Sequence, residues 1–262
     1  MKLCRFELKS SPGQARSGMV YSGKIYETDG AQAVAVHEAE AVRPLSPIPH
    51  APSLRIFRTD LNEFVDASEP RFFYGNPGSL VGASQLINPP ESTVEMGILP
   101  MIAAVIVADA YRVDLADADD LILGFTLLSM LVDRTEERAD LAASAIGRSH
   151  DLGAAIGPVL TTPDELEDEV ETAQFGRRHA LSSVLRVNGV ERQRGSTGDI
   201  PFTFAQAISF ASQTCTLRTG DIFAFGPITE TDGEPVVLEP GDEVHIAVDR
   251  LGALSLKLSN PL

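Results

Sequence analysis

Short alternating and apolar segments follow one another along the chain, and most of them predict β-strands. The first, from Lys2 to Leu8, alternates polar and apolar residues as a half-buried strand does. Four glycines between Gly13 and Gly30 then separate short segments, which is typical of a β-meander. Four prolines between Arg43 and Pro52 predict a linker. We therefore expect a small N-terminal β domain over residues 1–52 and a larger body over residues 53–262.

Two long apolar runs predict the buried centre of that body. Residues 101–112 are apolar and rich in β-branched side chains, and residues 121–132 are apolar almost throughout. Both runs suit buried strands, although periodicity alone leaves a buried helix open for the second. Residues 202–212 predict a helix. Thr162-Pro163-Asp164-Glu165 predicts the start of a short, acidic and solvated helix, with threonine as the cap.

Four turns complete the pattern. Asn188-Gly189 lies between alternating segments and favours a type I′ hairpin turn, because both residues accept positive φ. Leu251-Gly252 separates two apolar stripes over residues 244–258 and predicts a second hairpin. Thr219-Gly220-Asp221 and Pro240-Gly241-Asp242 predict two tight turns, each leading into a strand. Together these elements predict a β-rich α+β body after the small N-terminal module.

Composition and charge narrow the class of protein. The chain has 262 residues with 44% apolar and 22% charged residues, which is enough for a sizeable core. Its 21 basic and 37 acidic residues leave a net charge of −16, which opposes binding to nucleic acid or an anionic membrane. The start lacks the apolar stretch of a signal peptide, and the longest apolar stretch is too short to span a bilayer. We therefore expect a cytoplasmic protein with neither of these partners.

The sequence lacks several short motifs that mark metal, nucleotide or nucleophile sites. Cys4 and Cys215 lie far apart, with no CxxC and no zinc-type spacing, so we expect two buried thiols. No G-x-S-x-G nucleophile motif, P-loop or G-x-G-x-x-G dinucleotide motif occurs. Function must therefore be sought in less direct signals.

From Pro70 onward, a series of short motifs resembles the fumarylacetoacetate hydrolase superfamily in its order. The motifs are Leu123-Gly124-Phe125-Thr126, Asp151 before Ile156-Gly157-Pro158-Val159, Val187-Asn188-Gly189, residues 193–200, residues 217–222 and residues 238–244. Each is weak alone, but the ordered series is specific. The opening MKLCRF and the prolines near Pro47 also resemble the family's small N-terminal domain.

The resemblance implies a fold of mixed β-rolls around a central barrel, usually in a homodimer. It also implies a small-molecule substrate, because the family mostly cleaves or rearranges β-dicarbonyl compounds and oxo acids. Family members typically hold Mg²⁺ or Mn²⁺ with an E-x-E pair and an aspartate. Such a hard cation takes oxygen ligands and stabilises the enolate of a dicarbonyl substrate.

This chain departs from that metal site. The E-x-E pair falls on Glu95-Met96-Gly97, so the second carboxylate is replaced by glycine. The family's aspartate falls six residues after Gly124, on Met130, whose thioether does not hold Mg²⁺. The same register places Arg134 on a family arginine. If the alignment with the family is shifted by three residues, Asp133 takes the place of the aspartate, but Arg134 no longer falls on the family arginine.

Other positions that the resemblance marks as active-site residues also differ. One family lysine becomes Arg148, which keeps the charge but is no base at neutral pH. A second becomes Tyr74. The family's lid carries a histidine and a glutamate that activate water, whereas the corresponding residues 55–70 contain no histidine. Gln193, Thr197 and Asp151 remain.

These positions supply the candidate site. The candidate catalytic residues are Glu95, Arg148, Tyr74 and His150; the candidate substrate-binding residues are Arg134, Asp151, Gln193, Thr197 and Met130. Glu95 is the candidate base, the arginines are anion clamps, and Tyr74 is a hydrogen-bond donor to an oxyanion. His150 is the histidine best placed for acid/base work, because it lies beside Arg148 and Asp151. Gln193 and Thr197 are candidates for orienting a substrate carboxylate.

Each residue also has an ordinary structural interpretation. Glu95 would then be a hydrogen-bonded remnant, the arginines would form structural ion pairs, and Gln193 and Thr197 would be turn residues. Met130 would belong to the core, and His150 would be a surface loop residue.

We interpret the chain as a divergent enzyme of this family that works without a bound metal or other cofactor. It would isomerise, cyclise or otherwise rearrange an enolisable dicarbonyl or oxo-acid substrate, of the larger apolar kind met in natural-product metabolism. One alternative is a Mg²⁺- or Mn²⁺-dependent hydrolase or decarboxylase with a rearranged site. Another is a catalytically inactive binding or partner subunit.

Overall fold

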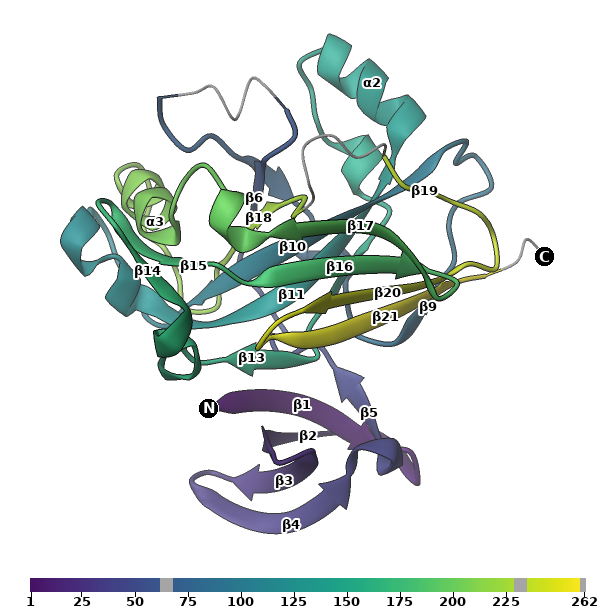
Figure 1. Ribbon diagram of the computed structural model, residues 1–262, viewed down its shortest axis with the longest axis vertical. Coiled ribbons are helices and arrows are strands. Elements are labelled where there is room, and N and C mark those ends of the chain that lie inside the picture. Colours follow the sequence, from purple (N-terminus) through teal and green to yellow (C-terminus); the bar gives the residue numbers. More distant parts are fainter. Residues whose placement is uncertain (62–67, 229–234, 260–262) are drawn as a thin grey trace.

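The computed structural model describes residues 1–61, 68–228 and 235–259 (Figure 1). The chain begins with a small sheet that lies below the larger body in this view. Its strands are β1 (Lys2–Leu8), β2 (Ser11–Tyr21), β3 (Lys24–Asp29), β4 (Gln32–Glu38) and β5 (Val42–Leu45). β1 also pairs antiparallel with a strand of the body, with Cys4 opposite Val159. The small sheet is therefore hydrogen-bonded to the body.

The body is built on a long sheet whose two central strands are buried on both faces. This sheet continues into β1–β5 through the pairing of β1 with β13. Its strands within the body are β6 (Leu54–Arg58), β7 (Phe73–Gly75), β8 (Leu80–Gly82), β10 (Met96–Ile106), β11 (Ile122–Asp133), β12 (Ala154–Ile156), β13 (Val159–Thr161), β18 (Ile222–Gly226) and β19 (Val237–Leu238). β10 and β11 pair along their whole length, from Met96 opposite Asp133 onward. The apolar run over residues 121–132 is thus a strand, and the run over residues 101–112 forms a strand only as far as Ile106.

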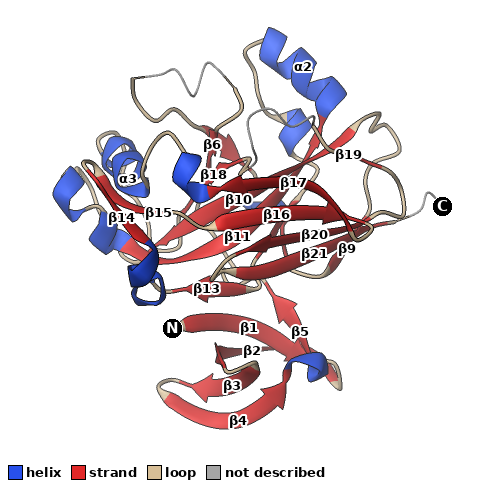
Figure 2. Ribbon diagram, viewed as in Figure 1, coloured by secondary structure: helices blue, strands red, loops and turns tan. Residues whose placement is uncertain are grey.

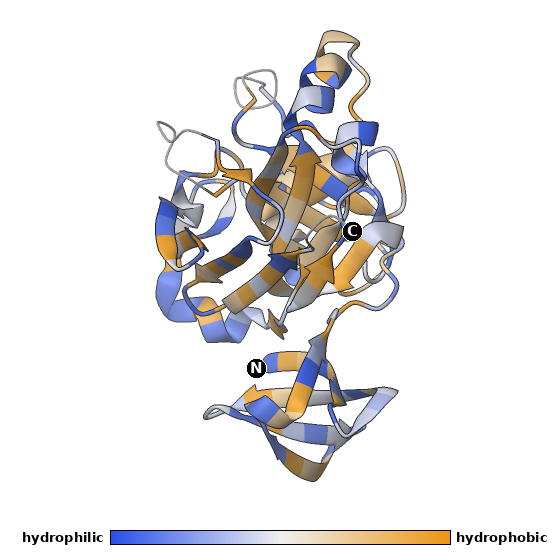
Figure 3. Cartoon of the chain, turned by 90° about the vertical axis from the view of Figure 1, so that its right-hand side faces the viewer, coloured by the Kyte–Doolittle hydropathy of each residue, from blue (hydrophilic) through white to orange (hydrophobic). Residues whose placement is uncertain are grey.

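A second sheet packs against the first. Its strands are β9 (Gln85–Ile87), β16 (Ser182–Val187), β17 (Val190–Ser196), β20 (Glu243–Val248) and β21 (Gly252–Leu258). A separate two-stranded ribbon consists of β14 (Val170–Ala173) and β15 (Gly176–His179). Leu185 and Ile246 of the second sheet share a buried cluster with Ile102 and Leu127 of the first. Apolar residues accordingly gather in the strands of the body (Figure 3). The β-rich fold with few helices confirms the predicted class (Figure 2).

The turn chemistry of the sequence is confirmed. Asn188 and Gly189 have φ of 52° and 78°, as a type I′ turn requires. The helix expected over residues 202–212 is α3 (Phe204–Ser212), which begins with a capping box between Thr203 and Gln206. The helix expected after Thr162 is instead a 3-10 helix, Pro163–Glu169, and the Thr162 side chain does not cap it. Its hydroxyl contacts Asp164 and the backbone of Met1.

The α-helix that follows β11 was not predicted. α2 (Arg134–Ala142) follows β11 directly, and the Asp133 carboxylate accepts hydrogen bonds from the backbone N–H groups of Thr135 and Glu136. Cys4 and Cys215 are both free thiols, but only Cys4 is fully buried. In the part of the chain that the structure describes, no helix is both long and apolar enough to cross a membrane.

Candidate active site

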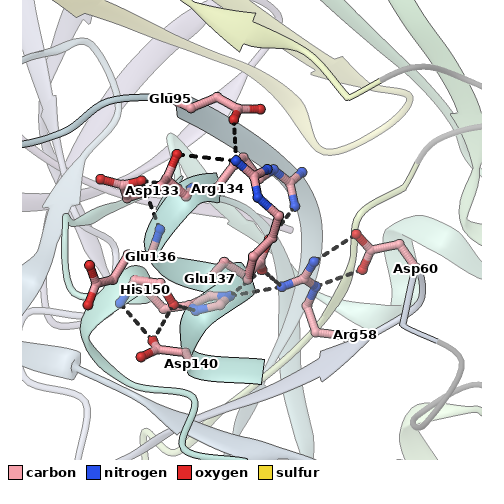
Figure 4. Close-up of polar contacts among 12 residues, drawn as sticks. Arg58, Asp60, Glu95, Asp133, Arg134, Glu136, Glu137, Asp140 and His150 are labelled. Carbon is pink, nitrogen blue, oxygen red and sulfur yellow. Dashed lines mark hydrogen bonds and ion pairs between the residues drawn. The ribbon is translucent and has the colours of Figure 1, made fainter. Parts of the chain in front are cut away.

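Charged side chains from three segments meet at one end of the long sheet. Arg58 is the last residue of β6, and Arg134 is the first residue of α2. Glu137 follows on the inner side of α2, and His150 ends the 3-10 helix Arg148–His150. Figure 4 shows these side chains pointing toward one another, with Asp60 beside Arg58. We name Arg58, Arg134, Glu137 and His150 the charged network.

Glu137 joins two guanidinium groups inside this network. The Arg58 Nη1 atom donates to Glu137 Oε1 at 2.5 Å, and the Arg134 Nη1 atom donates to Glu137 Oε2 at 2.8 Å. The other face of Arg58 is held by Asp60, through two hydrogen bonds of 2.7 Å each. The Arg58 side chain is 0% exposed and the Glu137 side chain is 6% exposed. The pair is therefore a buried ion pair with bidentate support from Asp60.

The protonation of the network follows from these contacts. Burial alone would raise the pKa of Glu137, but the charge of Arg58 and the hydrogen bonds that Arg58 and Arg134 donate outweigh burial and hold this pKa far below its ordinary value. Burial also opposes the charge of Arg58, and Asp60 and Glu137 more than offset that cost and raise the pKa of Arg58. Glu137 and Arg58 are therefore charged at neutral pH.

His150 is buried within a chain of hydrogen bonds. The alternative interpretation of His150 as a surface loop residue is therefore wrong. The Ser149 hydroxyl donates to Asp140 Oδ2 at 2.7 Å, and that hydrogen bond lowers the pKa of Asp140. The Ser149 oxygen, 2.8 Å away, is then left to accept from Nδ1–H of His150. The other nitrogen, Nε2, accepts from Arg58 Nη1 at 2.8 Å. Burial and the charge of Arg58 lower the pKa of His150, so the ring is neutral.

Arg134 lies against the glycine that replaces the second carboxylate of the E-x-E pair. A Cβ atom placed on Gly97 would lie 2.6 Å from Nε of Arg134 and 2.9 Å from Cγ1 of Val132. Real Cβ contacts are longer, so the guanidinium occupies the space that a side chain at this position would need. Within the described residues, the buried Nε atom of Arg134 has no hydrogen-bond partner. The structure thus places a cation where the resemblance implies a metal ligand.

Glu95 and Arg148 lie at the outer side of the network. The Glu95 carboxylate, on a side chain 32% exposed, accepts a hydrogen bond of 2.7 Å from Arg138. Its backbone carbonyl accepts from the N–H of Arg134 at 2.9 Å, which ties the two residues together. Arg148 is largely exposed and lies 3.6 Å from Glu136. The structure therefore brings Glu95, Arg134 and His150 into one region, with Arg148 at its rim.

Met130 and Asp133 have structural surroundings. Met130 is buried opposite Leu99, in an apolar cluster with Met101 and Ala154. Asp133 uses its carboxylate to cap α2. Neither residue offers a free oxygen ligand to the network.

The remaining candidates lie elsewhere. Tyr74 is exposed, and the centroid of its ring lies 5.5 Å from the guanidinium carbon of Arg55. Asp151 is also exposed, and its carboxylate accepts a hydrogen bond from the side chain of Asn76. Thr197 is buried, donates to the carbonyl of His179 and accepts from the N–H of Leu181. Among the described residues, no hydrogen bond or ion pair links these three candidates to the charged network.

Two candidates remain only partly placed. Gln193 lies half-buried in β17 rather than in a turn. The region compared with the family's lid, residues 55–70, is described only at its ends, since residues 62–67 lie outside the described part. Their roles stay predictions.

Sequence reasoning missed Arg58 and Glu137. Arg58 ends the strand LRIFR, which also contains Arg55, so its charge alone does not set it apart in the sequence. Glu137 follows Arg134 at the i, i+3 spacing that pairs side chains on a helix, but α2 itself was not predicted. Among residues 1–61, 68–228 and 235–259, no three His, Cys, Asp or Glu side chains are grouped as a metal ion would need.

Comparison with known proteins assigns this architecture. The profile described as fumarylacetoacetate (FAA) hydrolase C-terminal matches residues 33–259. An oxaloacetate tautomerase of Xenopus laevis is 30% identical over 191 residues, which cover 71% of this chain and 57% of that protein. A 2,4-didehydro-3-deoxy-L-rhamnonate hydrolase of a Sphingomonas species is 27% identical over 293 aligned residues, covering 99% and 96% of the two chains. This chain thus spans less than two thirds of the tautomerase.

Solved structures show the same fold. The crystal structure of 5-carboxymethyl-2-hydroxymuconate delta-isomerase from Mycobacterium smegmatis superimposes with a TM-score of 0.80, at 21% identity and over 100% of both chains. A fumarylacetoacetate hydrolase from Exiguobacterium antarcticum has the same TM-score, identity and coverage. The resemblance drawn from the ordered motifs is therefore confirmed.

Proposed function

Since the chain belongs to the fumarylacetoacetate hydrolase family, we propose that it is a divergent enzyme that rearranges an enolisable dicarbonyl or oxo-acid substrate without a bound metal. The reaction is an isomerisation, a cyclisation or a similar proton-shift rearrangement. The tautomerase and isomerase names of similar proteins support this reaction type. The observation that carries metal independence is the Arg134 guanidinium packed on Gly97.

The residues present do not fit Mg²⁺ or Mn²⁺. Such cations need several oxygen ligands in a defined geometry. Glu95 pairs with Arg138, position 97 provides no side chain, and Met130 lies in an apolar cluster. A divalent cation beside Gly97 would also face the positive charge of Arg134 at short range. We therefore derive no step through a metal.

Arg134 supplies the positive charge in this proposal. When a proton leaves the carbon beside a carbonyl group, negative charge develops on the carbonyl oxygen, and a preorganised cationic donor stabilises it. The Arg134 side chain is 12% exposed and has only Glu137 as an ion-pair partner among the described residues, whereas Arg58 is fully buried and donates to Asp60, Glu137 and His150. Arg58 and His150 are thus positioning residues: Arg58 fixes Glu137, and Glu137 fixes Arg134.

Glu95 acts as the base. Its partly exposed carboxylate is reachable by a substrate, and its backbone is hydrogen-bonded to Arg134. The carboxylate takes the proton from the carbon, the electron pair moves onto the carbonyl oxygen beside Arg134, and return of the proton to a different atom completes the rearrangement.

Proton exchange tests this proposal before the natural substrate is known. Protein treated with excess chelator is mixed with oxaloacetate or phenylpyruvate in D₂O, and loss of the proton signal beside the carbonyl group is followed by NMR. We expect exchange faster than in buffer alone, because proton removal needs only Glu95 and Arg134. Exchange that appears only after Mg²⁺ or Mn²⁺ is restored would favour the metal-dependent hydrolase or decarboxylase.

A second candidate is a catalytically inactive binding or partner subunit. The observation that favours it is the mutual neutralisation of the network, in which Asp60 and Glu137 balance Arg58 and Arg134. This candidate predicts ligand binding without proton exchange in any condition.

A further inference from the structure

A cavity of about 670 Å³ lies beside the charged network. It is lined by residues that precede and begin β7, by α2 and the loop after it, and by α3. The main lining residues are Arg71, Phe72, Phe73, Leu141, Ile146 and Phe210. Its volume lies within the range of sites that bind small organic molecules.

The walls of this cavity favour a ring-bearing ligand. Phe72, Phe73 and Phe210 come from two separate segments, and Leu141 and Ile146 add aliphatic surface. All five side chains are only half-buried, so a ligand would remove apolar surface from water. Aromatic side chains interact well with the faces and edges of a bound ring.

Arg71 gives the cavity a charge preference. It is exposed, and no carboxylate among the described residues pairs with it. This contrasts with Arg58, Arg134 and Arg138, each of which has a carboxylate partner. Because no carboxylate of the described residues holds its guanidinium, Arg71 can bind the carboxylate of a ligand in bidentate geometry.

The cavity shares a wall with the charged network. The Phe73 ring meets the His150 ring edge-on, with 4.9 Å between the ring centroids. Leu141 follows Glu137 by four residues on α2, so the two side chains lie on the same face of the helix. A ligand in the cavity therefore lies next to the groups that fix Arg134.

We propose that this cavity binds a carboxylate with an aromatic body, with Arg71 holding the carboxylate and the three phenylalanines holding the ring. The proposal rests on the proposed function only where it identifies this ligand with the substrate class, which is then an aryl-substituted oxo acid. Binding itself is independent of any reaction.

Calorimetry with 3-phenylpropanoate as the probe tests the cavity alone, because this acid has no carbonyl group beside its carboxylate that could enolise. We expect saturable binding to the full chain, and a dissociation constant about tenfold higher or more in Arg71→Gln. Arg192→Gln is the matched control, since Arg192 is also exposed and lies on β17 outside this cavity. It should bind like the wild type. Ala145→Trp, which fills the cavity from its lining, should abolish binding.

The outcomes separate the two proposals. Absence of binding to the wild type, or equal binding by the Arg71 and Arg192 variants, would overturn the cavity proposal. Each variant should unfold at the temperature of the wild type, and thermal unfolding checks that its fold is kept. Binding of both 3-phenylpropanoate and phenylpyruvate without proton exchange in phenylpyruvate would support the cavity and contradict the proposed reaction.

Discussion

Replacing Glu137 with alanine is expected to lower the free energy of unfolding by about 3–5 kcal/mol. The substitution leaves the fully buried Arg58 guanidinium with only Asp60 as an anionic partner, and it leaves Arg134 without its ion pair. Removing one partner of a buried ion pair costs far more than losing a surface contact. Urea unfolding at neutral pH measures the change as a shift of the midpoint at constant slope.

Glu136→Ala is the matched control for this substitution. Glu136 is the preceding residue of the same helix, is 37% exposed and lies 3.6 Å from Arg148. Its loss should change the free energy of unfolding by less than about 1 kcal/mol, as for other exposed ion pairs. Equal effects of the two substitutions would show that the network does not stabilise the fold.

The same network predicts sensitivity to acid. The pKa of Glu137 is lowered by folding, so its contribution is complete above the ordinary value of 4.5 and is lost as the pH falls below that value. The pKa of His150 is also lowered, chiefly by burial, so protonation of the unfolded chain already favours unfolding as the pH falls below 6.5. Wild-type stability should therefore begin to decline as the pH falls below 6.5, and below pH 4.5 it should decline less steeply in Glu137→Ala than in the wild type.

Glu95→Gln is expected to slow chelator-resistant proton exchange by about 10²–10⁴-fold, the range by which a positioned general base accelerates proton transfer. The amide keeps the size of the side chain and an oxygen that accepts from Arg138, but it does not take up a proton. Stability should change little, because the side chain is partly exposed. The rate is measured by NMR on the substrate that exchanges fastest.

Glu171→Gln controls for the loss of one negative charge, since Glu171 is exposed on β14. It should keep the wild-type exchange rate. If Glu95→Gln also stays within about threefold of the wild type, Glu95 is not the base.

Much of the fold could be predicted because its signals are local. The positive φ of Asn188-Gly189 and the apolar length of residues 121–132 each depend on a few neighbouring residues, and both predictions are confirmed. α2 was missed because its hydropathy is low and it begins where a buried strand ends. Asp133 at the cap position and Glu136 in the first turn could have indicated the start of this helix. The pairing of β1 with β13 depends on tertiary contact and has no local signature.

The candidate site was predictable only in part. The resemblance leads to Glu95 and Arg134, and the position beside Arg148 and Asp151 leads to His150. The structure places Glu95, Arg134 and His150 in one region. Arg58 and Glu137 are 79 residues apart and belong to no motif, so their ion pair follows only from the three-dimensional fold. The space above Gly97 is likewise a tertiary property: the sequence shows a missing carboxylate, and the structure shows the arginine that takes its place.

Metal binding to chelator-stripped protein tests the central claim most directly. Titration with Mn²⁺ and with Mg²⁺ by calorimetry, at neutral pH and up to millimolar metal, should give no saturable heat, because Gly97 and Met130 offer no oxygen ligands and Arg134 opposes a second cation. Tight one-to-one binding of either ion would contradict a metal-free site and restore the metal-dependent hydrolase or decarboxylase as the leading interpretation.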